Sequence, residues 1–292
     1  MNKELPPSSS HYLTLVLSVL CIGTSGPLGR LIHISPGVII CIRSLIAFLI
    51  LFLLLKLSGK SIYINNRKTR NYILLSGVFL AAHWITYFYA LQVSTVALAM
   101  LSMFTYPVIT VLVEPVYLNK PFKFIQIPVA VIALIGIYIM LPDFDISNQH
   151  TLGILLGLLS AFLYAGRNLL LKKYATGENG LVVMCQQLLV VVVLTLPFFF
   201  FKAISIFEIK EFWYYLLFLG VITTAMGHSF FVKSLRHFSA STVGIISNFT
   251  PVVGIILGII FLQESLSQNI VIGGSLILFT ALLEVWIGIR KK

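Results

Sequence analysis

Charged side chains are scarce in this chain of 292 residues, because only 10% of its residues are Asp, Glu, Lys or Arg, against roughly 25% in typical soluble domains. Hydrophobic residues make up 59% of the sequence, and the mean hydropathy is +1.01. A water-soluble globule of this size could not bury so much apolar surface. A spanning helix needs about 20 apolar residues, and the charges cluster about that far apart. The sequence therefore predicts a protein of the lipid bilayer.

Acidic residues are the scarcer of the two charges, since 9 Asp and Glu stand against 20 Lys and Arg and leave a net charge of +11. In a soluble protein this excess would suggest a nucleic-acid partner. Here the basic residues stand in loops between apolar runs, where they orient a membrane protein, so we expect no nucleic-acid binding. The three cysteines, Cys21, Cys41 and Cys185, form no CxxC pair and are typical of reduced packing residues.

The motifs of ATP-driven pumps and of intramembrane enzymes are missing as well. The sequence contains no GxxxxGK[ST] loop and no HExxH helix, which excludes ATP hydrolysis by this chain and a zinc helix of that type. An intramembrane enzyme needs paired acids, or a nucleophile and a base, at mid-membrane, whereas the acids here stand at helix ends or in loops. We expect no catalytic residue, no metal and no cofactor.

Apolar runs between polar punctuation predict an all-α integral membrane fold of ten transmembrane helices. The expected ranges are 12–32, 36–57, 71–92, 94–118, 121–141, 151–173, 181–202, 212–235, 239–263 and 267–289. Lys and Arg gather in the loops of one side, and only Arg30, Lys202 and Lys210 fall on the other. By the positive-inside rule we expect both termini in the cytoplasm and the chain in the inner (plasma) membrane. The rival interpretation of the first run is a cleaved signal peptide at residues 1–30.

The chain also repeats itself. A shift of 144 positions aligns Pro107 with Pro251 without a gap and matches the hydropathy of the fourth and fifth helices with that of the ninth and tenth. We therefore predict two five-helix repeats, residues 1–146 and 147–292. Because five is odd, the second repeat enters the membrane from the opposite side. Inverted repeats of this kind place a shared substrate site near the bilayer midplane.

Two stretches carry a resemblance to a known family. The first is Ala-Leu-Gln-Val-Ser-Thr-Val-Ala at residues 90–97, leading to Thr-Tyr-Pro at Pro107, and the second is Ser-Ala-Ser-Thr-Val at residues 239–243, leading to Phe-Thr-Pro at Pro251. On these residues the chain resembles the EamA transporters of the drug/metabolite transporter superfamily over essentially all ten helices. The resemblance implies an exporter or facilitator whose central cavity is lined by helices one, three, four, six, eight and nine.

The sequence departs from the family pattern at the end of the fourth and ninth helices. Family members commonly carry Gly-Glu there, after the proline. Glu264 is present, but Gln263 stands where glycine is usual, and Lys120 takes the equivalent position in the first half. The departure leaves the fold expectation intact and weakens a role for the glutamate.

Pro107 and Pro251 lie about halfway along the fourth and ninth helices, where a proline removes one backbone donor and frees a carbonyl. Freed backbone groups in lipid need partners. The polar residues that flank the two prolines are Ser102, Thr105, Ser247, Asn248 and Thr250. They predict a polar pocket at matched depth in both halves, unless the hydroxyls simply bond back to their own helices.

Helix three carries His83, Trp84 and Tyr87, and helix eight carries His228, which corresponds to Trp84 under the repeat offset. These residues predict an aromatic-lined cavity, which would suit a flat or amphipathic organic substrate. A membrane histidine is more often a hydrogen-bonded packing residue than a proton carrier. Proton coupling through either histidine is therefore left open.

Arg43 stands about seven residues, or about 10 Å, inside helix two. An unpaired arginine at mid-bilayer costs about 2.5 to 3.5 kcal/mol, so Arg43 either snorkels to the headgroups or faces the cavity. Its repeat partner Gln187 is also polar, which favours the cavity, where a guanidinium could hold a substrate carboxylate or phosphate. Tyr164, Arg167 and Asn168 of helix six are further candidates for the lining.

Together these features predict a secondary carrier of a small organic metabolite, amino-acid-like or nucleoside-like, that works by alternating access and that we expect to act as an exporter. Its transport is either facilitated or proton-linked. We expect the substrate, the lipid bilayer and, under proton-linked transport, protons as its partners, and a monomer or weak homodimer as its oligomeric state. The alternatives are an intramembrane enzyme acting on a lipid-linked substrate and a structural or sensory subunit that transports nothing.

Overall fold

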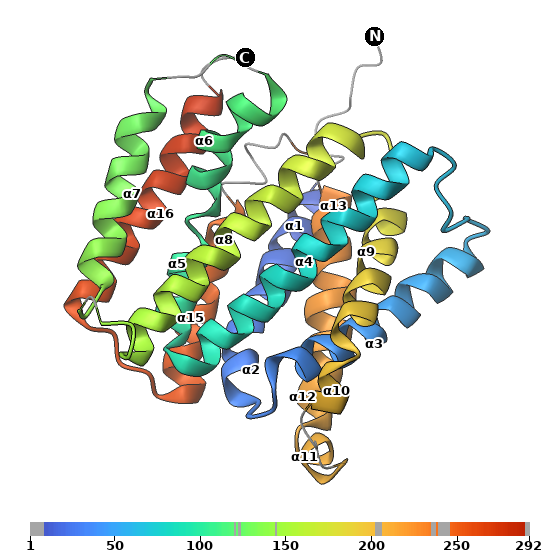
Figure 1. Ribbon diagram of the computed structural model, residues 1–292, viewed down its shortest axis with the longest axis horizontal. Helices are drawn as coiled ribbons and strands as arrows, with labels where there is room; N and C mark the ends of the chain where they lie inside the picture. Colours follow the sequence, from blue (N-terminus) through green and yellow to red (C-terminus); the bar gives the residue numbers. More distant parts are fainter. Residues whose placement is uncertain are drawn as a thin grey trace.

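The computed structural model describes residues 9–119, 121, 124–143, 145–201, 206–234, 238 and 246–289. Every regular element in these ranges is a helix (Figure 1). The helices are α1 (Ser9–Gly23), α2 (Ser25–Leu31), α3 (Pro36–Leu57), α4 (Arg67–Val93), α5 (Val96–Met103), α6 (Tyr106–Leu118), α7 (Gln126–Met140), α8 (Gln149–Tyr174), α9 (Gly180–Thr195), α10 (Phe198–Phe201), α11 (Ile206–Glu211), α12 (Trp213–Phe218), the π-helix η1 (Leu219–Gly227), α13 (His228–Ser234), α15 (Phe249–Leu262) and α16 (Gln268–Ile289).

Seven helical stretches in the described part of the chain are long and apolar enough to cross a membrane. They are Ser9–Leu31, Pro36–Leu57, Arg67–Val93, Val96–Leu118, Gln149–Tyr174, Gly180–Phe200 and Trp213–Phe231. Three further apolar helices are shorter, namely Gln126–Met140, Phe249–Leu262 and Gln268–Leu283. These spans confirm the all-α membrane class. The predicted start of the ninth helix, residues 239–245, lies outside the described residues.

Several of the predicted spans are broken along their length. The first run divides at Thr24, between α1 and α2, inside a segment rich in glycine, serine and proline. The fourth divides at Phe104 and Thr105, directly before Pro107, which lies in the first turn of α6. Pro251 likewise lies in the first turn of α15. A proline is tolerated in a first turn because the backbone N–H that it lacks would have no partner there. Each predicted kink is therefore observed as a break that precedes the proline.

Two helix ends share an unusual backbone conformation. Asn119 caps α6 with a φ of 51°, and Gln263 caps α15 with a φ of 54°. They are the two residues other than glycine with positive φ in the described ranges, and they stand at the repeat offset of 144 positions. Asparagine tolerates the left-handed region better than glutamine does. Gln263 therefore holds a strained conformation where the family usually has glycine.

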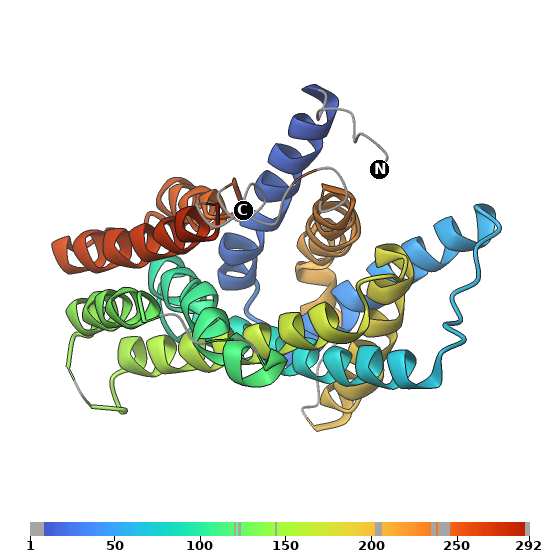
Figure 2. The same cartoon turned by 90° about the horizontal axis from the view of Figure 1, so that it is seen from above.

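The helices pack into two groups joined by a central pair. α4 lies along α8 through the middle of the molecule (Figure 1), α7 packs on α16 at one end, and α3 packs between α9 and η1 at the other. Figure 2 shows that α1 lies on the opposite side of the molecule from α4 and α8. At the α7–α16 contact a Cβ added to Gly136 would stand 2.8 Å from the Gly273 carbonyl oxygen. The absence of side chains there permits the close approach that membrane helices use for association.

Candidate functional site

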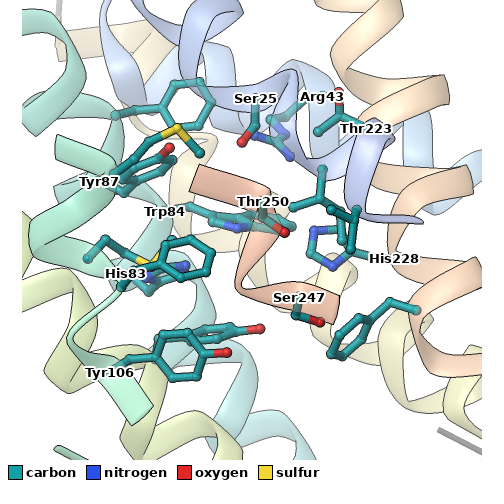
Figure 3. Close-up of a pocket in the computed structure, with 18 residues that line it drawn as sticks. Ser25, Arg43, His83, Trp84, Tyr87, Tyr106, Thr223, His228, Ser247 and Thr250 are labelled. Carbon is teal, nitrogen blue, oxygen red and sulfur yellow. The ribbon is translucent and has the colours of Figure 1, made fainter. Parts of the chain in front are cut away.

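A cavity of about 70 Å³ lies at the centre of the molecule, which is room for on the order of five water molecules. Helices from both halves of the chain enclose it (Figure 3). Eight of the predicted site residues line it, namely Arg43, His83, Trp84, Tyr87, Tyr164, His228, Ser247 and Thr250. Its lining comes from the helices that the family resemblance implies, and in addition from α3, which supplies Arg43.

Arg43 is buried, with 1% of its surface exposed. Its Nε and Nη2 atoms both donate to the Thr224 hydroxyl oxygen, at 3.0 and 2.8 Å, and its guanidinium carbon lies 4.7 Å from the centre of the Trp84 ring. Its third nitrogen, Nη1, has no hydrogen-bond partner. The snorkelling alternative does not describe this side chain, because the guanidinium faces the cavity.

The Thr224 hydroxyl owes its position to the π-helix. In η1 the hydroxyl donates to the carbonyl oxygen of Leu219, five residues earlier, at 2.7 Å. In an α-helix the corresponding bond reaches three or four residues back. Single π-turns are often found at functional sites, and here the wide turn places the acceptor for Arg43.

Arg167 is the second guanidinium inside a spanning helix, and it does not line the cavity. Its Nη2 donates to the Gln187 amide oxygen at 2.7 Å, and its Nη1 donates to the Asn168 amide oxygen at 3.2 Å. Gln187 in turn donates to the Ser76 hydroxyl at 2.6 Å. Asn168 is thus occupied by Arg167, outside the cavity lining, and the repeat partner of Arg43 is tied into a second polar network.

The two histidines differ in how they are held. His83 Nδ1 lies 2.7 Å from the Ser160 hydroxyl oxygen and 3.0 Å from the Ser160 carbonyl oxygen, and the His83 ring lies 4.6 Å from that of Tyr164. The His228 ring lies 5.8 Å from that of Trp84. Both histidines line the cavity. His83 is held there by hydrogen bonds to Ser160, as a packing residue would be, whereas His228 lies beside the tryptophan that corresponds to it in the repeat.

The residues beside the two prolines behave differently in the two halves. Ser102 donates to the carbonyl oxygen of Leu98 at 2.6 Å, and Thr105 donates to the carbonyl oxygen of Ser102 at 2.7 Å. Both hydroxyls thus bond back to their own helix, outside the lining. In the second half Ser247 and Thr250 line the cavity, whereas Asn248 is buried outside the lining. Of the five flanking polar residues that were predicted, only Ser247 and Thr250 of the second half line the cavity.

Comparisons with known proteins identify the family to which the chain belongs. The model of the EamA-like transporter family matches the chain twice, at residues 9–141 and 151–286. The chain belongs to the EamA-like transporter family. Among curated relatives of this EamA-like chain are the pseudopaline exporters CntI of Pseudomonas aeruginosa strains UCBPP-PA14 and PAO1, each 25% identical over 248 residues, which are 82% of this chain and 82% of the relative.

A solved crystal structure shares the fold of this EamA-like chain. It superposes with a TM-score of 0.68 at 16% identity, over 98% of this chain and 100% of the other. At that identity the likeness concerns the fold alone. It shows that the arrangement of broken helices around a centre belongs to an experimentally known architecture.

Sequence reasoning missed three polar residues of the EamA-like cavity. Ser25, Tyr106 and Thr223 all line it. Two of them had a readable signal, because Ser25 lies in the helix-breaking segment of the first span and Tyr106 stands directly before Pro107. Thr223 had none, because a hydroxyl in an apolar run does not reveal the direction in which its helix turns it.

Glu264 of this EamA-like chain joins its two halves away from the cavity. Both carboxylate oxygens accept from the Val96 N–H, at 3.0 Å each, and so cap the start of α5. Arg30 donates to the Gln92 carbonyl oxygen close by, and the Gln92 amide donates to the carbonyl oxygens of Ile32 and Ile34 at 2.9 and 2.7 Å. Burial raises the pKa of the Glu264 carboxyl, and the Val96 bond and the Arg30 charge oppose that rise. Glu264 therefore has a structural role, which the departures from the family motif at Gln263 and Lys120 had made harder to predict.

Proposed function

We propose that this protein is a secondary carrier that exports a small organic metabolite through the central cavity by alternating access. The observation that carries the proposal is the cavity itself, which residues of both halves enclose and which combines aromatic rings with polar groups (Figure 3). Pockets of this character suit amphipathic organic ligands, amino-acid-like or nucleoside-like compounds among them. The relatives named CntI are pseudopaline exporters, and their name supports outward transport as the direction proposed here.

Alternating access rests on a ten-helix fold of two inverted repeats, residues 1–146 and 147–292. The two separate family matches support this division, and so do the left-handed caps Asn119 and Gln263 at the repeat offset. Equivalent helices also make equivalent contacts, since α3 packs on η1 and α9 packs on α4. In such a fold the two halves rock around a fixed central site. We place the chain in the inner membrane with both termini in the cytoplasm.

The cavity favours a carrier over the two alternatives. A structural or sensory subunit predicts tightly closed helices without a central cavity. An intramembrane enzyme predicts paired acids, or a nucleophile held by a base, at mid-membrane. The described residues that line the cavity include no Asp, Glu or Cys, and the Ser247 hydroxyl in the lining has no hydrogen-bond partner, so no histidine holds it as a nucleophile. Translocation therefore fits the lining better than catalysis does.

Untargeted mass spectrometry of the growth medium tests export whatever the transported solute is. Bacterial cells that produce the chain are compared with cells that produce Thr250→Trp, which fills the cavity. The matched control is Leu134→Trp, because the Leu134 side chain on α7 is 66% exposed on the outer surface of the helical bundle. We expect at least one solute to accumulate outside cells with the natural chain and with Leu134→Trp, about fivefold over cells with Thr250→Trp. Equal media in all three cultures would contradict export.

Proteoliposomes then separate facilitated from proton-linked transport. The accumulated solute is loaded inside, and its efflux is followed with and without a pH step across the membrane. Proton-linked transport predicts an efflux rate that changes with the pH step and a loss of that response in His228→Gln. Facilitated transport predicts equal rates, which would exclude a coupling role for either histidine.

A further inference from the structure

We infer that the transported metabolite carries a carboxylate, and that Arg43 binds this group at one end of the cavity. The inference rests on the proposed transport function, since it names the chemical class of the solute that enters this same site. Its basis is a buried cation in the cavity lining, one nitrogen of which has no hydrogen-bond partner, and the described residues that line the cavity supply no anion for it.

The hydrogen-bonding capacity of Arg43 is only partly used. A guanidinium has five N–H donors and no acceptor. The Nε and Nη2 atoms share a single acceptor, the Thr224 hydroxyl, and the rings of Trp84 and Phe88 cover the cation at 4.7 and 5.2 Å. Nη1 is buried without any partner, although buried nitrogens are normally bonded. A substrate oxygen would complete the set.

The charge around the cavity has one sign. The described residues that line it include no carboxylate, and none of the hydrogen bonds made by Arg43 or Arg167 goes to one. The charge of Arg167 adds to that of Arg43, because its guanidinium carbon lies 5.7 Å from the ring centre of Tyr164, which lines the cavity. In a low dielectric such a field is weakly screened. It therefore favours an anionic solute and opposes a cationic one.

The lining also sets where the remainder of the solute lies. Figure 3 shows Arg43 and Ser25 at one end of the cavity, Ser247 and Tyr106 at the other, and Trp84 between them. The Ser247 hydroxyl, like Arg43 Nη1, has no hydrogen-bond partner. A solute with a carboxylate at one end, an apolar or planar middle and a polar group at the other end matches this order.

Binding to purified protein tests the class directly. The probes are three acid–amide pairs of increasing size, namely acetate and acetamide, benzoate and benzamide, and N-acetyltryptophan and N-acetyltryptophanamide. A bound ligand raises the melting temperature according to its concentration over its dissociation constant. We expect at least one acid to stabilise the natural chain more strongly than its amide does, with a difference in affinity of about tenfold or more. Acids and amides that act alike would overturn the inference, and so would chloride or phosphate that stabilises as well as the best acid.

The arginine variants assign the preference to Arg43. Arg43→Gln keeps a polar side chain without the charge, Arg43→Lys keeps the charge without the fork, and Arg67→Gln removes an exposed arginine as the matched control. We expect Arg67→Gln to keep the acid preference, Arg43→Lys to weaken it and Arg43→Gln to abolish it. A preference that survives in Arg43→Gln overturns the assignment. If Arg43→Gln does not fold, Arg43→Lys decides, because a full preference there would contradict a fork-shaped contact.

The exported solutes separate this inference from the proposed function. If no solute is released by the natural chain, the transport proposal fails. If the released solutes are neutral or cationic, export stands and the carboxylate inference fails. Release of carboxylate-bearing solutes that Arg43→Gln abolishes and Arg67→Gln preserves supports both.

Discussion

Arg43 and Arg167 are two guanidiniums inside spanning helices that differ in the number of acceptors that the protein gives them. Arg167 bonds to two amide oxygens, those of Gln187 and Asn168, and leaves its Nε without a partner. Arg43 shares one hydroxyl between two nitrogens and leaves the third without a partner. Both have been taken out of water, which costs free energy unless hydrogen bonds compensate. The two arginines differ in their acceptors and in their place, since Arg167 has two acceptors and lies outside the cavity lining, whereas Arg43 has one acceptor and lines the cavity. The comparison teaches that Arg167 serves the fold and that a solute in the cavity could complete the bonding of Arg43.

The sharpest way to break this comparison is to remove each charge in turn. Arg167→Met leaves the amide oxygens of the buried Gln187 and the partly buried Asn168 without this donor, and we expect it to lower the stability by about 2 kcal/mol. Arg43→Met removes an incompletely bonded cation, so we expect an unchanged or raised melting temperature in detergent. An equal loss in both variants would show that Arg43 is structural too.

A double-mutant cycle sharpens the Arg167 side of the comparison. Gln187→Leu removes the acceptor of the 2.7 Å bond, and Arg167→Met removes its donor. Because the double variant leaves no orphaned partner in this bond, we expect it to cost about 1 kcal/mol less than the sum of the single variants. Melting temperatures of the four proteins measure the coupling, and strictly additive changes would show that the bond contributes nothing specific.

Removing the hydroxyl anchor tests the Arg43 side. Thr224→Val keeps the shape of the side chain but takes away the acceptor of both Arg43 bonds. We expect a loss of about 1 kcal/mol in stability and a weaker acid preference, because the guanidinium loses its fixed direction. Ser76→Ala is the counterpart on the other network, and it should cost less, since Gln187 keeps its bond to Arg167. Thermal melts with and without the best acid probe compare the two.

The smallest effect is expected at Glu264, whose charge is opposite in sign to those of Arg43 and Arg167. Burial raises its pKa above the ordinary value of 4.5, so the folded protein binds a proton more readily than the unfolded chain does. Its contribution to stability is therefore fully present below the ordinary pKa and is lost as the pH rises through the raised one. We expect a slight fall in melting temperature across that range, absent in Glu264→Gln. The same fall in the variant would assign the pH dependence to other groups.

The sequence predicted helix ends best where short polar segments bound an apolar run. The range 36–57 was predicted and α3 spans Pro36–Leu57. A proline opens this helix, a lysine stands in its last turn, and a serine and a glycine follow it. The breaks were harder to predict. The division at Thr24 is held by contact of its hydroxyl oxygen with that of Thr223 at 2.9 Å, from a helix about 200 positions away in the chain. A contact between segments so far apart in the chain cannot be predicted from the local helix propensity of the sequence.

The candidate site was predictable for residues that are expensive to bury. Arg43, His83 and Trp84 stood out because polar or amphipathic groups in an apolar run need a reason to be there. The rotation of helix six was not predictable from the sequence, and of its candidates Tyr164 lines the cavity while Asn168 bonds to Arg167. Helices that are apolar all round give no period from which to read a face.

The wide turn of η1 has a consequence for how the site can respond to its occupant. The Thr224 hydroxyl accepts from Arg43 in the position that its own hydrogen bond to the Leu219 carbonyl oxygen, five residues earlier, gives it. Rewinding that stretch to an ordinary α-helix would carry the hydroxyl around the helix axis and uncouple it from the guanidinium. The orientation of the Arg43 guanidinium on α3 thus depends on the helical pitch of η1 in the opposite half. A bound solute and the relative position of the two halves are coupled through this contact.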